Sequence, residues 1–445
     1  MIPIPRHFLF VLAVIVPTAG RCAAAPSAAV QLRAGFAKAD ITPDPRMLNW
    51  TVPNAQPYRT IHDPLFARAL VLSDGETKLA LLVWDLLDAR EYAVARVRAA
   101  ITRATGIPED HILLSATHNH SGPKSEMGSG PALEREERTS RPAQNGPTYQ
   151  EWADRLVQTC VDLVQQASAS PQPVDLRIAR AYVGEWLFNR RPVRPDQTVV
   201  STLNPKDPHV LGDGLRFGTV DPTMTVLSLR ASGGKNVCTL FHLPMHAVAV
   251  YGAYKGVSAD WPGRVVDLLQ AKLGSDAMFL QGCAGDIVPA RRGFEAVEAM
   301  SLLISERAVA ADKVAIKLAP EKIRVSRARL GLPAIPIAAK AMRRTELDAE
   351  VTVATIGTLA LVTLPGEPLQ ELSTAIQGRS PFPHTVVLGY TNGRGVGYVG
   401  LPGGKAKGGY EMSEVGTGTD EVGGFLVETA LRLLRDQAGA ARVVK

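Results

Sequence analysis

The chain has 445 residues, 46% of them hydrophobic and 21% charged, and its formal net charge is +6 at pH 7. This length is ample for a buried core, and the charge excess is mild. The chain has no dense Lys/Arg cluster with interleaved aromatic residues, so nucleic acid is excluded as an expected partner.

The first 25 residues have the three parts of a secretory signal. Two basic residues at 6–7 precede an apolar run over 8–16, and three alanines follow at 23–25. The run is shorter than the roughly 20 residues that span a bilayer, and no later apolar stretch reaches that length. We therefore expect a signal peptide at residues 1–25, cleaved near residue 25, and a secreted or periplasmic mature protein. A short uncleaved anchor is the alternative.

Strand-like and helix-like patterns alternate after the predicted signal. Alternating or short apolar runs predict strands at 65–73, 78–87, 111–116, 175–183, 223–232, 236–244, 277–282, 350–358, 359–365 and 384–390. Periodicity near 3.6 residues predicts helices at 93–106, 149–167, 261–273, 294–311 and 421–437. This mixture predicts an α/β fold of mixed sheets with flanking helices.

Two long segments without regular patterns interrupt this alternation. They cover residues 122–148 and 189–214, and loops of this length in compact domains are usually functional or disordered. No internal repeat or low-complexity linker divides the chain, so we expect residues 26–445 to form a single domain. Three cysteines follow the predicted signal without C-x-x-C spacing, and one disulfide or buried free thiols are both consistent with them.

Four strand ends carry side chains that suit a metal site. Zinc prefers neutral imidazole and carboxylate ligands, and the turns that follow strands are the usual place for site residues. In chain order these side chains are His118 and His120 in "HILLSATHNHSGP", His242 and His246 in "FHLPMHAV", Glu367 in "LVTLPGEP", and Tyr390 and Tyr398 in "GYTNGRGVGYVG". Each spacing alone is weak evidence, because two surface histidines in an ordinary loop give the same pattern.

Six ordered stretches together resemble the neutral ceramidase family, the zinc amidases that split ceramide into sphingosine and fatty acid. They are "GFAKADITP", "THNHSGP", "MHAVAVYGAYKGVSADWPG", "QGCAGDIVP", "LPGEP" and "GYVGLPGGKAKGGYE". The resemblance runs from about residue 34 to the end of the chain. It implies a neutral-ceramidase-like catalytic domain and leaves no room for the family's C-terminal immunoglobulin-like domain.

The resemblance also implies a Zn²⁺ ion as cofactor. Its four ligands, carried over by position, are His118, His246, Glu367 and Tyr398. His242 competes with His246, but only His246 has the family's spacing to the Ser-Ala-Asp stretch at 258–260. Tyr398 follows Asn392 with one residue more than in the family, which leaves its register open.

Three further residues resemble the groups that hold the substrate amide and its developing oxyanion: His120, Arg190 in "FNRR" and Tyr410 in "GGYE". An imidazole, a guanidinium and a phenol can all donate a hydrogen bond to a carbonyl oxygen as charge builds on it. The alternatives are that His120 orients His118, that Arg190 is a structural ion pair with Arg191 as its rival, and that Tyr410 only packs.

One position departs from the family. The family's Gly-Asp-x-Ser-Pro turn supplies the serine nucleophile, whereas residues 285–289 here read Gly-Asp-Ile-Val-Pro. Val288 has no hydroxyl, so we expect zinc-bound water to attack the carbonyl directly, with poor or no activity on ceramide. Zinc lowers the pKa of bound water to roughly 7, so hydroxide is available without a serine. A serine relocated to Ser121 or Ser258 is the alternative.

The sequence therefore predicts a secreted zinc-dependent hydrolase that cleaves an amide or ester bond. Its expected partner is a small-molecule or lipid-like N-acyl substrate, and peripheral contact with a membrane is left open. Two alternatives remain: a non-catalytic protein that keeps the zinc pocket to bind a ligand, and an acyl-transfer or cyclising enzyme. The oxyanion donors argue against the binding protein, because a pocket that only binds has no need of them.

Overall fold

The computed structural model describes residues 30–43, 60–125, 147–202, 210–212, 214–252, 254–319 and 321–443. The predicted signal peptide lies outside these residues, as does most of the irregular segment predicted at 122–148. None of the helices in the described ranges has both the length and the apolar character to cross a membrane. The single domain predicted over residues 26–445 stays a prediction.

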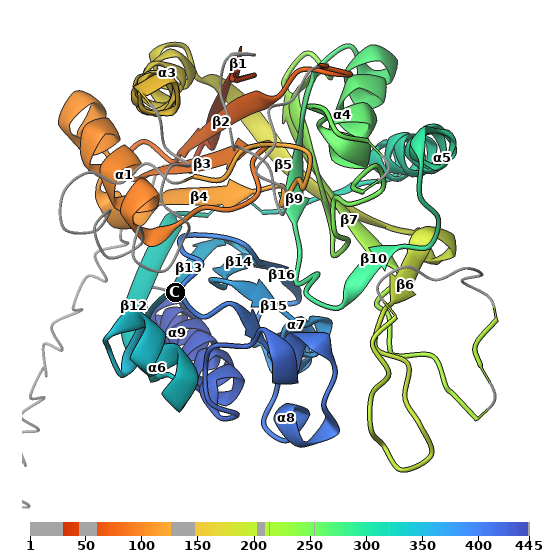
Figure 1. Ribbon diagram of the computed structural model, residues 1–445. Helices are drawn as coiled ribbons and strands as arrows, with labels where there is room; N and C mark the ends of the chain where they lie inside the picture. The colour runs from red at the N-terminus through yellow and green to blue at the C-terminus, as the bar shows by residue number, and fades with distance from the viewer. Residues whose placement is uncertain are drawn as a thin grey trace, which may run out of the picture.

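Two sheets lie face to face in the middle of the molecule (Figure 1). The larger runs in the order β4 (Ile112–Ala116), β3 (Lys78–Trp84), β2 (Phe66–Ser73), β1 (Arg33–Asp40), β5 (Gln172–Tyr182), β7 (Thr223–Ala231), β8 (Asn236–Leu243) and β9 (Asp276–Gln281), with β11 (Ile316–Lys317) beside β5. The smaller runs in the order β12 (Ile323–Pro333), β13 (Glu346–Ile356), β14 (Leu359–Thr363) and β16 (His384–Leu388). Both mix parallel and antiparallel pairs.

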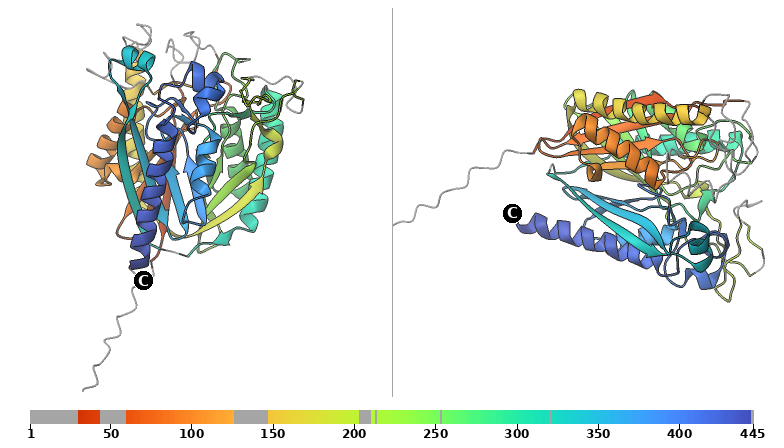
Figure 2. Two further views of the ribbon diagram at one scale, coloured as in Figure 1. Left: turned by 90° about the horizontal axis from the view of Figure 1, so that it is seen from below. Right: turned by 60° about the vertical axis from the view of Figure 1, so that its left-hand side comes forward.

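Helices cover the outer face of each sheet. On the larger sheet, α1 (Glu91–Thr105) and α3 (Pro147–Ala169) pack beside α4 (Asp260–Leu273) and α5 (Phe294–Lys313). On the smaller sheet, α7 (Gln370–Gln377) and α9 (Val422–Val443) do the same. Figure 2 shows the resulting helix–sheet–sheet–helix layers. The α/β fold with mixed sheets and flanking helices is therefore confirmed.

The alternation of side chains along each strand explains why both faces of the larger sheet are apolar. In β2, Leu70 and Leu72 face the smaller sheet, whereas Ala69 and Val71 face α1 and α3. A strand buried on both faces reads as a continuous apolar run, which is why β2 and β3 were predicted from the sequence. The three cysteines predicted to be in a disulfide or free are buried free thiols: Cys160, Cys238 and Cys283.

Of the strands missing from the list predicted from the sequence, β12 is the longest. β12 lies at the edge of the smaller sheet and most of its residues are only partly buried. Its charged residues Arg324, Arg327 and Arg329 break the apolar pattern on which strands are recognised. Charge on an edge strand also discourages pairing with other chains.

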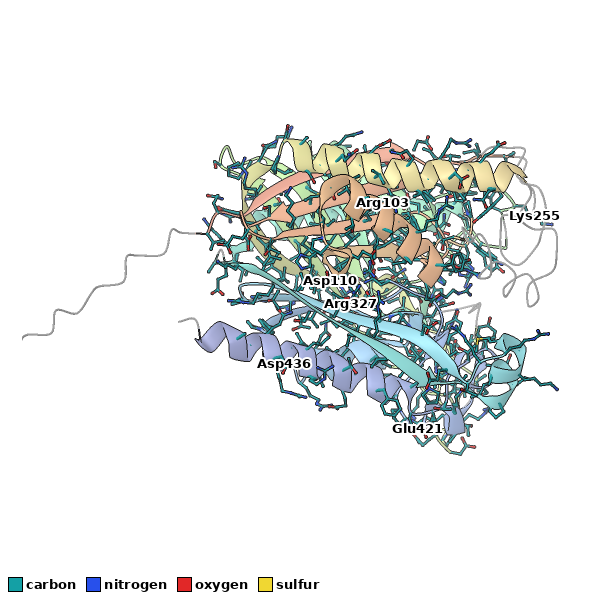
Figure 3. The ribbon with its side chains drawn as sticks, turned by 90° about the vertical axis from the view of Figure 1, so that its left-hand side faces the viewer. Arg103, Asp110, Lys255, Arg327, Glu421 and Asp436 are labelled. Atoms are coloured by element: carbon teal, nitrogen blue, oxygen red, sulfur yellow. The ribbon has the colours of Figure 1, made fainter. Side chains whose placement is uncertain are left out.

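A buried ion pair crosses between the layers where α1 meets β13. The guanidinium of Arg98 donates to both oxygens of Glu350, at 3.0 and 2.9 Å, and its Nε donates to Ile112 O at 2.8 Å. Arg327 lies along the same junction, 3.6 Å from Glu350 (Figure 3). The pair therefore ties the larger sheet's helices to the smaller sheet.

Replacing Arg98 by alanine is expected to lower the free energy of unfolding by about 3 kcal/mol, because Glu350 would stay buried without its bidentate partner. Urea unfolding followed by circular dichroism measures this. A double variant, Arg98→Met with Glu350→Leu, removes both charges and should recover much of the loss. An unfolding free energy equal to that of the unmodified protein in the single variant would contradict the assignment.

Candidate metal centre and substrate cavity

The four strand ends singled out from the sequence meet at one end of the two sheets. Backbone hydrogen bonds join the segments directly: His120 N donates to Ala247 O, Ala116 N to Tyr390 O, and Tyr390 N to Gly366 O, each at 3.2 Å. Residues separated by up to 274 positions in the sequence are thereby neighbours. Figure 2 shows that α9 extends away from the end of the molecule that carries α6 (Pro336–Met342) and α8 (Gly404–Lys407), the end at which the site lies.

Three predicted ligands bring their polar atoms together. His118 Nε2 lies 3.1 Å from Glu367 Oε2, and His246 Nε2 lies 3.5 Å from the same oxygen. All three side chains are almost completely buried. The Nε2 of His120 lies 3.1 Å from that of His118, so His118, His120 and His246 form a group whose ligand atoms are within 4.8 Å of one another.

The hydrogen bonds of the two ligand histidines fix their tautomers. His118 Nδ1 lies 2.7 Å from Leu87 O, and His246 Nδ1 lies 2.6 Å from Ala284 O. A carbonyl oxygen only accepts, so each Nδ1 carries the proton and each Nε2 presents a lone pair to Glu367. This arrangement is typical of histidines that bind a metal. Because Leu87 holds Nδ1 of His118, His120 is not the residue that orients that ring.

The atoms at the centre fit a cation. The Nε2 of His246 and Oε2 of Glu367 are buried and make no hydrogen bond within the described part of the chain. Lone pairs of His118 and His246 facing a carboxylate oxygen repel one another, and an unsatisfied buried polar atom costs about 1–3 kcal/mol. A cation between them satisfies all three atoms.

The local pKa values agree with a neutral imidazole at His246 and an ionised carboxylate at Glu367. Burial, followed by the charge of Arg190, lowers the pKa of His246 to about 3. Burial would raise the pKa of Glu367, but His118, His246 and Arg394 lower it well below its usual value. An uncharged imidazole and an ionised carboxylate are the forms that bind zinc.

Tyr398 lies beside Glu367 because of a short parallel ladder. β15 (Glu367–Pro368) pairs with β17 (Tyr398–Val399), and the register sets Glu367 opposite Tyr398. The phenol oxygen of Tyr398 accepts a hydrogen bond from Arg190 Nη2 at 3.0 Å. Gly366 has φ +73°, and a Cβ there would meet Gly397 O at 2.4 Å, so only glycine permits this close approach. The longer loop after Asn392 therefore leaves Tyr398 in reach of the site.

Arg190 and Arg191 both bind the carboxylate of Glu411, which is completely buried. Arg190 Nε and Arg191 Nη1 each donate to one of its oxygens at 2.7 Å. Arg190 then reaches Tyr398 and Gly285 O, whereas Arg191 turns away to Gly408 O. Arg190 therefore takes part in a structural ion pair, which was the alternative interpretation, and it is also the arginine that faces the site.

Aromatic rings surround the histidines. The ring of Tyr390 lies 4.3 Å from that of His118, and the ring of Tyr251 lies 5.0 Å from that of His120. Tyr410 opens the single π-helical turn η3 (Tyr410–Glu414), and its ring is 5.8 Å from that of Tyr398. Tyr251 and Glu411 lie within two of the stretches that carry the family resemblance, but neither was singled out from the sequence as a site residue.

Backbone strain is concentrated at the same place. His118, Tyr390 and Asn392 have φ values of 60°, 52° and 62°, a left-handed conformation that residues other than glycine seldom adopt. Such strain costs about 1–3 kcal/mol per residue and tends to occur at functional sites. The Oδ1 of Asn392 accepts from Leu114 N at 2.9 Å, which ties its loop to β4.

His242 does not join the centre. Its Nε2 lies 3.0 Å from Val387 O, between the sheets, and burial lowers its pKa to about 4. Among the described residues it is not part of the histidine group. The position of the two side chains therefore favours His246 over His242 as the predicted ligand.

Val288 lies in a strand next to the centre. β10 (Ile287–Pro289) pairs with β6 (Leu187–Asn189), and Val288 packs against Phe188, Val248 and Ala290, with no exposed surface. Its neighbour Ile287 accepts hydrogen bonds from the backbone N and Nδ1 of His246 through its carbonyl oxygen. The turn is thus intact, and Val288 gives it an apolar side chain where the family has a serine hydroxyl. The hydroxyl of Ser258 donates to Asp63 at 2.7 Å.

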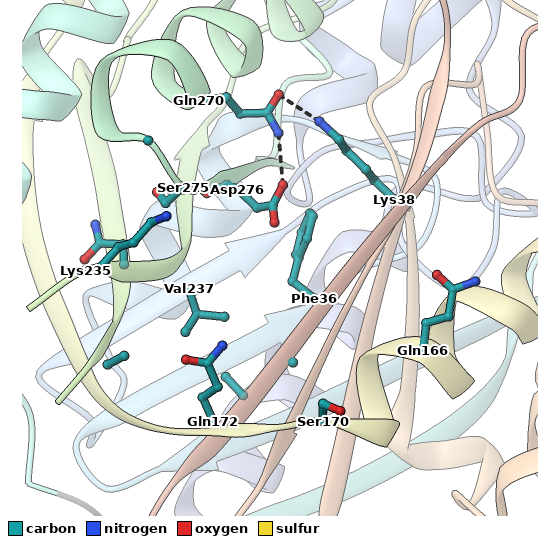
Figure 4. Close-up of a pocket in the computed structure, with 15 residues that line it drawn as sticks. Phe36, Lys38, Gln166, Ser170, Gln172, Lys235, Val237, Gln270, Ser275 and Asp276 are labelled. Carbon is teal, nitrogen blue, oxygen red and sulfur yellow. Dashed lines mark hydrogen bonds between the residues drawn. The ribbon is translucent and has the colours of Figure 1, made fainter. Parts of the chain in front are cut away.

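A cavity of about 570 Å³ opens beside the centre. Its polar lining includes His118, His120, Glu367, Tyr398 and Tyr410, and its apolar lining includes Leu87, Tyr92, Met342 and Val415. A second cavity, of about 580 Å³, lies away from it (Figure 4). There Lys38 donates to Gln270 at 3.1 Å and Gln270 to Asp276 at 3.2 Å, so these groups satisfy one another and form no catalytic set.

Comparison with known proteins agrees with this site. Residues 32–300 match the family described as neutral/alkaline non-lysosomal ceramidase, N-terminal. The match covers more than half of the chain, which therefore belongs to this family of hydrolases. A search among curated proteins gave no match.

Two solved structures have the same fold. The neutral ceramidase from Pseudomonas aeruginosa superposes with a TM-score of 0.70 at 20% sequence identity, over 92% of this chain and 75% of that one. A ceramidase complexed with C2 superposes with a TM-score of 0.71 at 18% identity, over 92% of this chain and 76% of that one. These likenesses establish the fold.

Proposed function

We propose that the protein is a zinc-dependent hydrolase that cleaves an amide or ester of an N-acyl type by direct attack of water. The observation that carries the proposal is the unpartnered His246 Nε2 and Glu367 Oε2 facing His118 Nε2 beside the cavity. Val288 in place of the family's serine supports attack without a covalent intermediate.

His118, His246, Glu367 and Tyr398 would hold the ion. When bound there, zinc lowers the pKa of water to about 7 and polarises a carbonyl oxygen. Two observations support Tyr398 as a ligand. Its strand pairs with that of Glu367, and its phenol oxygen lies at the site, where it accepts from Arg190.

Three side chains would bind and polarise the substrate carbonyl: His120 and Tyr410, which line the cavity, and Arg190, which contacts Tyr398. Arg190 keeps its charge beside Glu411, and the pKa of Arg190 is raised above its usual value by Tyr398 and Glu411 against burial, which would lower it. His120 and Tyr410 line the cavity and can donate to the same oxygen. In the net reaction the carbonyl carbon gains the water oxygen, the C–N or C–O bond breaks, and the leaving group departs with a proton.

The test is a search for a covalent intermediate. With an activated acyl ester and zinc present, rapid-mixing kinetics should show no burst, and mass spectrometry should find no acyl group on the protein. Both follow from Val288, because the turn at 285–289 has no nucleophile. An adduct on any serine, or efficient turnover of ceramide, would overturn the proposed mechanism.

We also propose that the protein is exported. The basic, apolar and small-residue parts of residues 1–25 stand in signal order, which supports cleavage near residue 25. N-terminal sequencing of protein from a native-type host should therefore begin near residue 25 or 26. Soluble cytosolic protein that still begins at Met1 would refute export.

A further inference from the structure

Beyond the metal centre, the wall of the cavity carries three arginines, Arg90, Arg344 and Arg394. Arg394 stands apart because it also approaches the centre: its Nη2 lies 3.7 Å from Glu367 Oε1. It belongs to the loop between β16 and β17, where this chain has one residue more than the family pattern that it resembles. About 36% of its side chain is exposed, so the guanidinium faces the cavity rather than the core.

The backbone and one end of the Arg394 side chain are fixed. Its backbone N donates to Glu91 Oε1 at 2.7 Å, and its Nη1 donates to Asp88 Oδ2 at 3.1 Å. Within the described chain, its Nε and Nη2 make no hydrogen bond. These two N–H groups form one edge of the guanidinium, the fork geometry that binds a carboxylate through two parallel hydrogen bonds.

The acids of the same wall, although Asp88 pairs with Nη1, leave the Nε–Nη2 edge of this arginine without a hydrogen bond in the described part of the chain. Asp88 is shared by Arg394 and Arg90, whose Nε lies 3.0 Å from it, and its other oxygen accepts from Ser125. Glu91 accepts the backbone N–H groups of Arg394 and Gly395. Asp348, for its part, pairs with Arg344. Glu367, the remaining acid near Arg394, has its charge directed to the metal in the proposed centre.

We propose that the substrate carries a carboxylate within a few bonds of the scissile bond, as an N-acyl amino acid does, and that Arg394 binds this group. The inference rests on the proposed function, because the reacting carbonyl must lie at the metal centre for Arg394 to stand one short group away from it. The apolar residues Leu87, Tyr92, Met342 and Val415 of the same cavity suit the acyl chain. Arg394 is then the residue that determines specificity.

The experiment compares four amides of matched length. N-octanoylglycine carries the carboxylate on the amine side, and N-hexyl succinamic acid carries it on the acyl side. N-octanoylglycinamide and N-octanoylethanolamine are the neutral controls. The zinc-loaded protein should cleave at least one of the acids with a kcat/KM about 10-fold or more above the neutral amides, because hydrogen bonds to charged groups are worth that much. The acid that is preferred identifies the side on which the carboxylate stands.

Arg394→Gln should reduce this preference to nearly none, mainly through KM. Arg379→Gln is the matched control, since Arg379 pairs with Glu428 on the far side of α9 and does not line the cavity. Arg394 lies near Glu367, so binding is also measured without metal. In chelated protein, calorimetry should show that N-octanoylglycine binds about 10-fold or more tightly than N-octanoylglycinamide, and that Arg394→Gln removes the difference.

Two failures are distinguishable. Equal cleavage of acidic and neutral amides, with no preference in calorimetry, would overturn the role of Arg394 while the hydrolase function stands. No cleavage of any amide by zinc-loaded protein would refute the proposed function, and the role of Arg394 in it would fail with it. A preference that Arg394→Gln leaves intact would also overturn the inference.

Discussion

Alanine in place of His118 or His246 is expected to remove the zinc and the amide hydrolysis together. Each substitution deletes one of the lone pairs that face Glu367 and leaves one histidine, the carboxylate and Tyr398, which is a weaker set of ligands for zinc. Metal analysis after dialysis should find about one equivalent of zinc in the unmodified protein and little in either variant. Circular dichroism checks that both variants fold.

His242→Ala is the matched control for these variants. It also removes a buried imidazole, but from a position that bonds to Val387 O outside the histidine group. It should keep the full equivalent of zinc. If both His118→Ala and His246→Ala kept their zinc, the centre would be misassigned; loss of zinc from His242→Ala alone would move the site to that residue.

The same measurement separates two roles for His120, whose Nε2 lies 3.1 Å from that of His118. If His120→Ala keeps zinc and loses activity, His120 acts as a donor to the oxyanion. If His120→Ala loses zinc, His120 contributes a ligand. The proposed function corresponds to the first result.

Glu411→Gln is expected to lower kcat by about 10²–10³ with little change in zinc content, because Arg190 would lose the charge that holds it toward Tyr398. Glu411 is completely buried and is not among the residues that line the cavity, so it acts through Arg190 and is a positioning residue. The amide of glutamine keeps the size of the side chain but can accept with only one oxygen, whereas the carboxylate accepts from Arg190 and Arg191 with two.

Glu411→Asp is the conservative comparison, and it should recover part of kcat because the charge returns. A purely structural role would predict a different pattern: lower thermal stability in both variants and unchanged kcat for the folded fraction. Steady-state kinetics together with thermal unfolding distinguish the two. Unchanged kcat in Glu411→Gln would contradict the role of Glu411.

Much of the fold could be predicted from the sequence because its strands are buried on both faces. β2 and β3 are largely apolar runs, and α3 and α9 repeat apolar residues at helical spacing. β12 could not be predicted in this way, because an edge strand is only partly buried and its pattern contains no such run.

The candidate site could likewise be predicted only in part from the sequence. Residues in short motifs, such as His118 and Glu367, could be named from the sequence and a family resemblance. Their roles stay predictions, although the structure brings them together. Glu411, Tyr251 and Arg394 could not be named, because their significance arises only from contacts with residues far along the chain. Glu411, for example, is 221 positions from Arg190.

The short ladder between Glu367 and Tyr398 has a consequence for how this site can change over generations. It holds both predicted ligands at the base of the loop that follows β16, where Gly366 permits the close approach. A change of length at the loop's tip would leave this base in place and would alter only the contacts of Arg394 and Gly395 with Glu91. The tip is where Arg394 stands, so a lineage can alter what the enzyme accepts while inheriting the metal centre unchanged. A change in the length of the loop at 391–397 can therefore change which substrates are bound without changing the residues that are proposed to hold the metal.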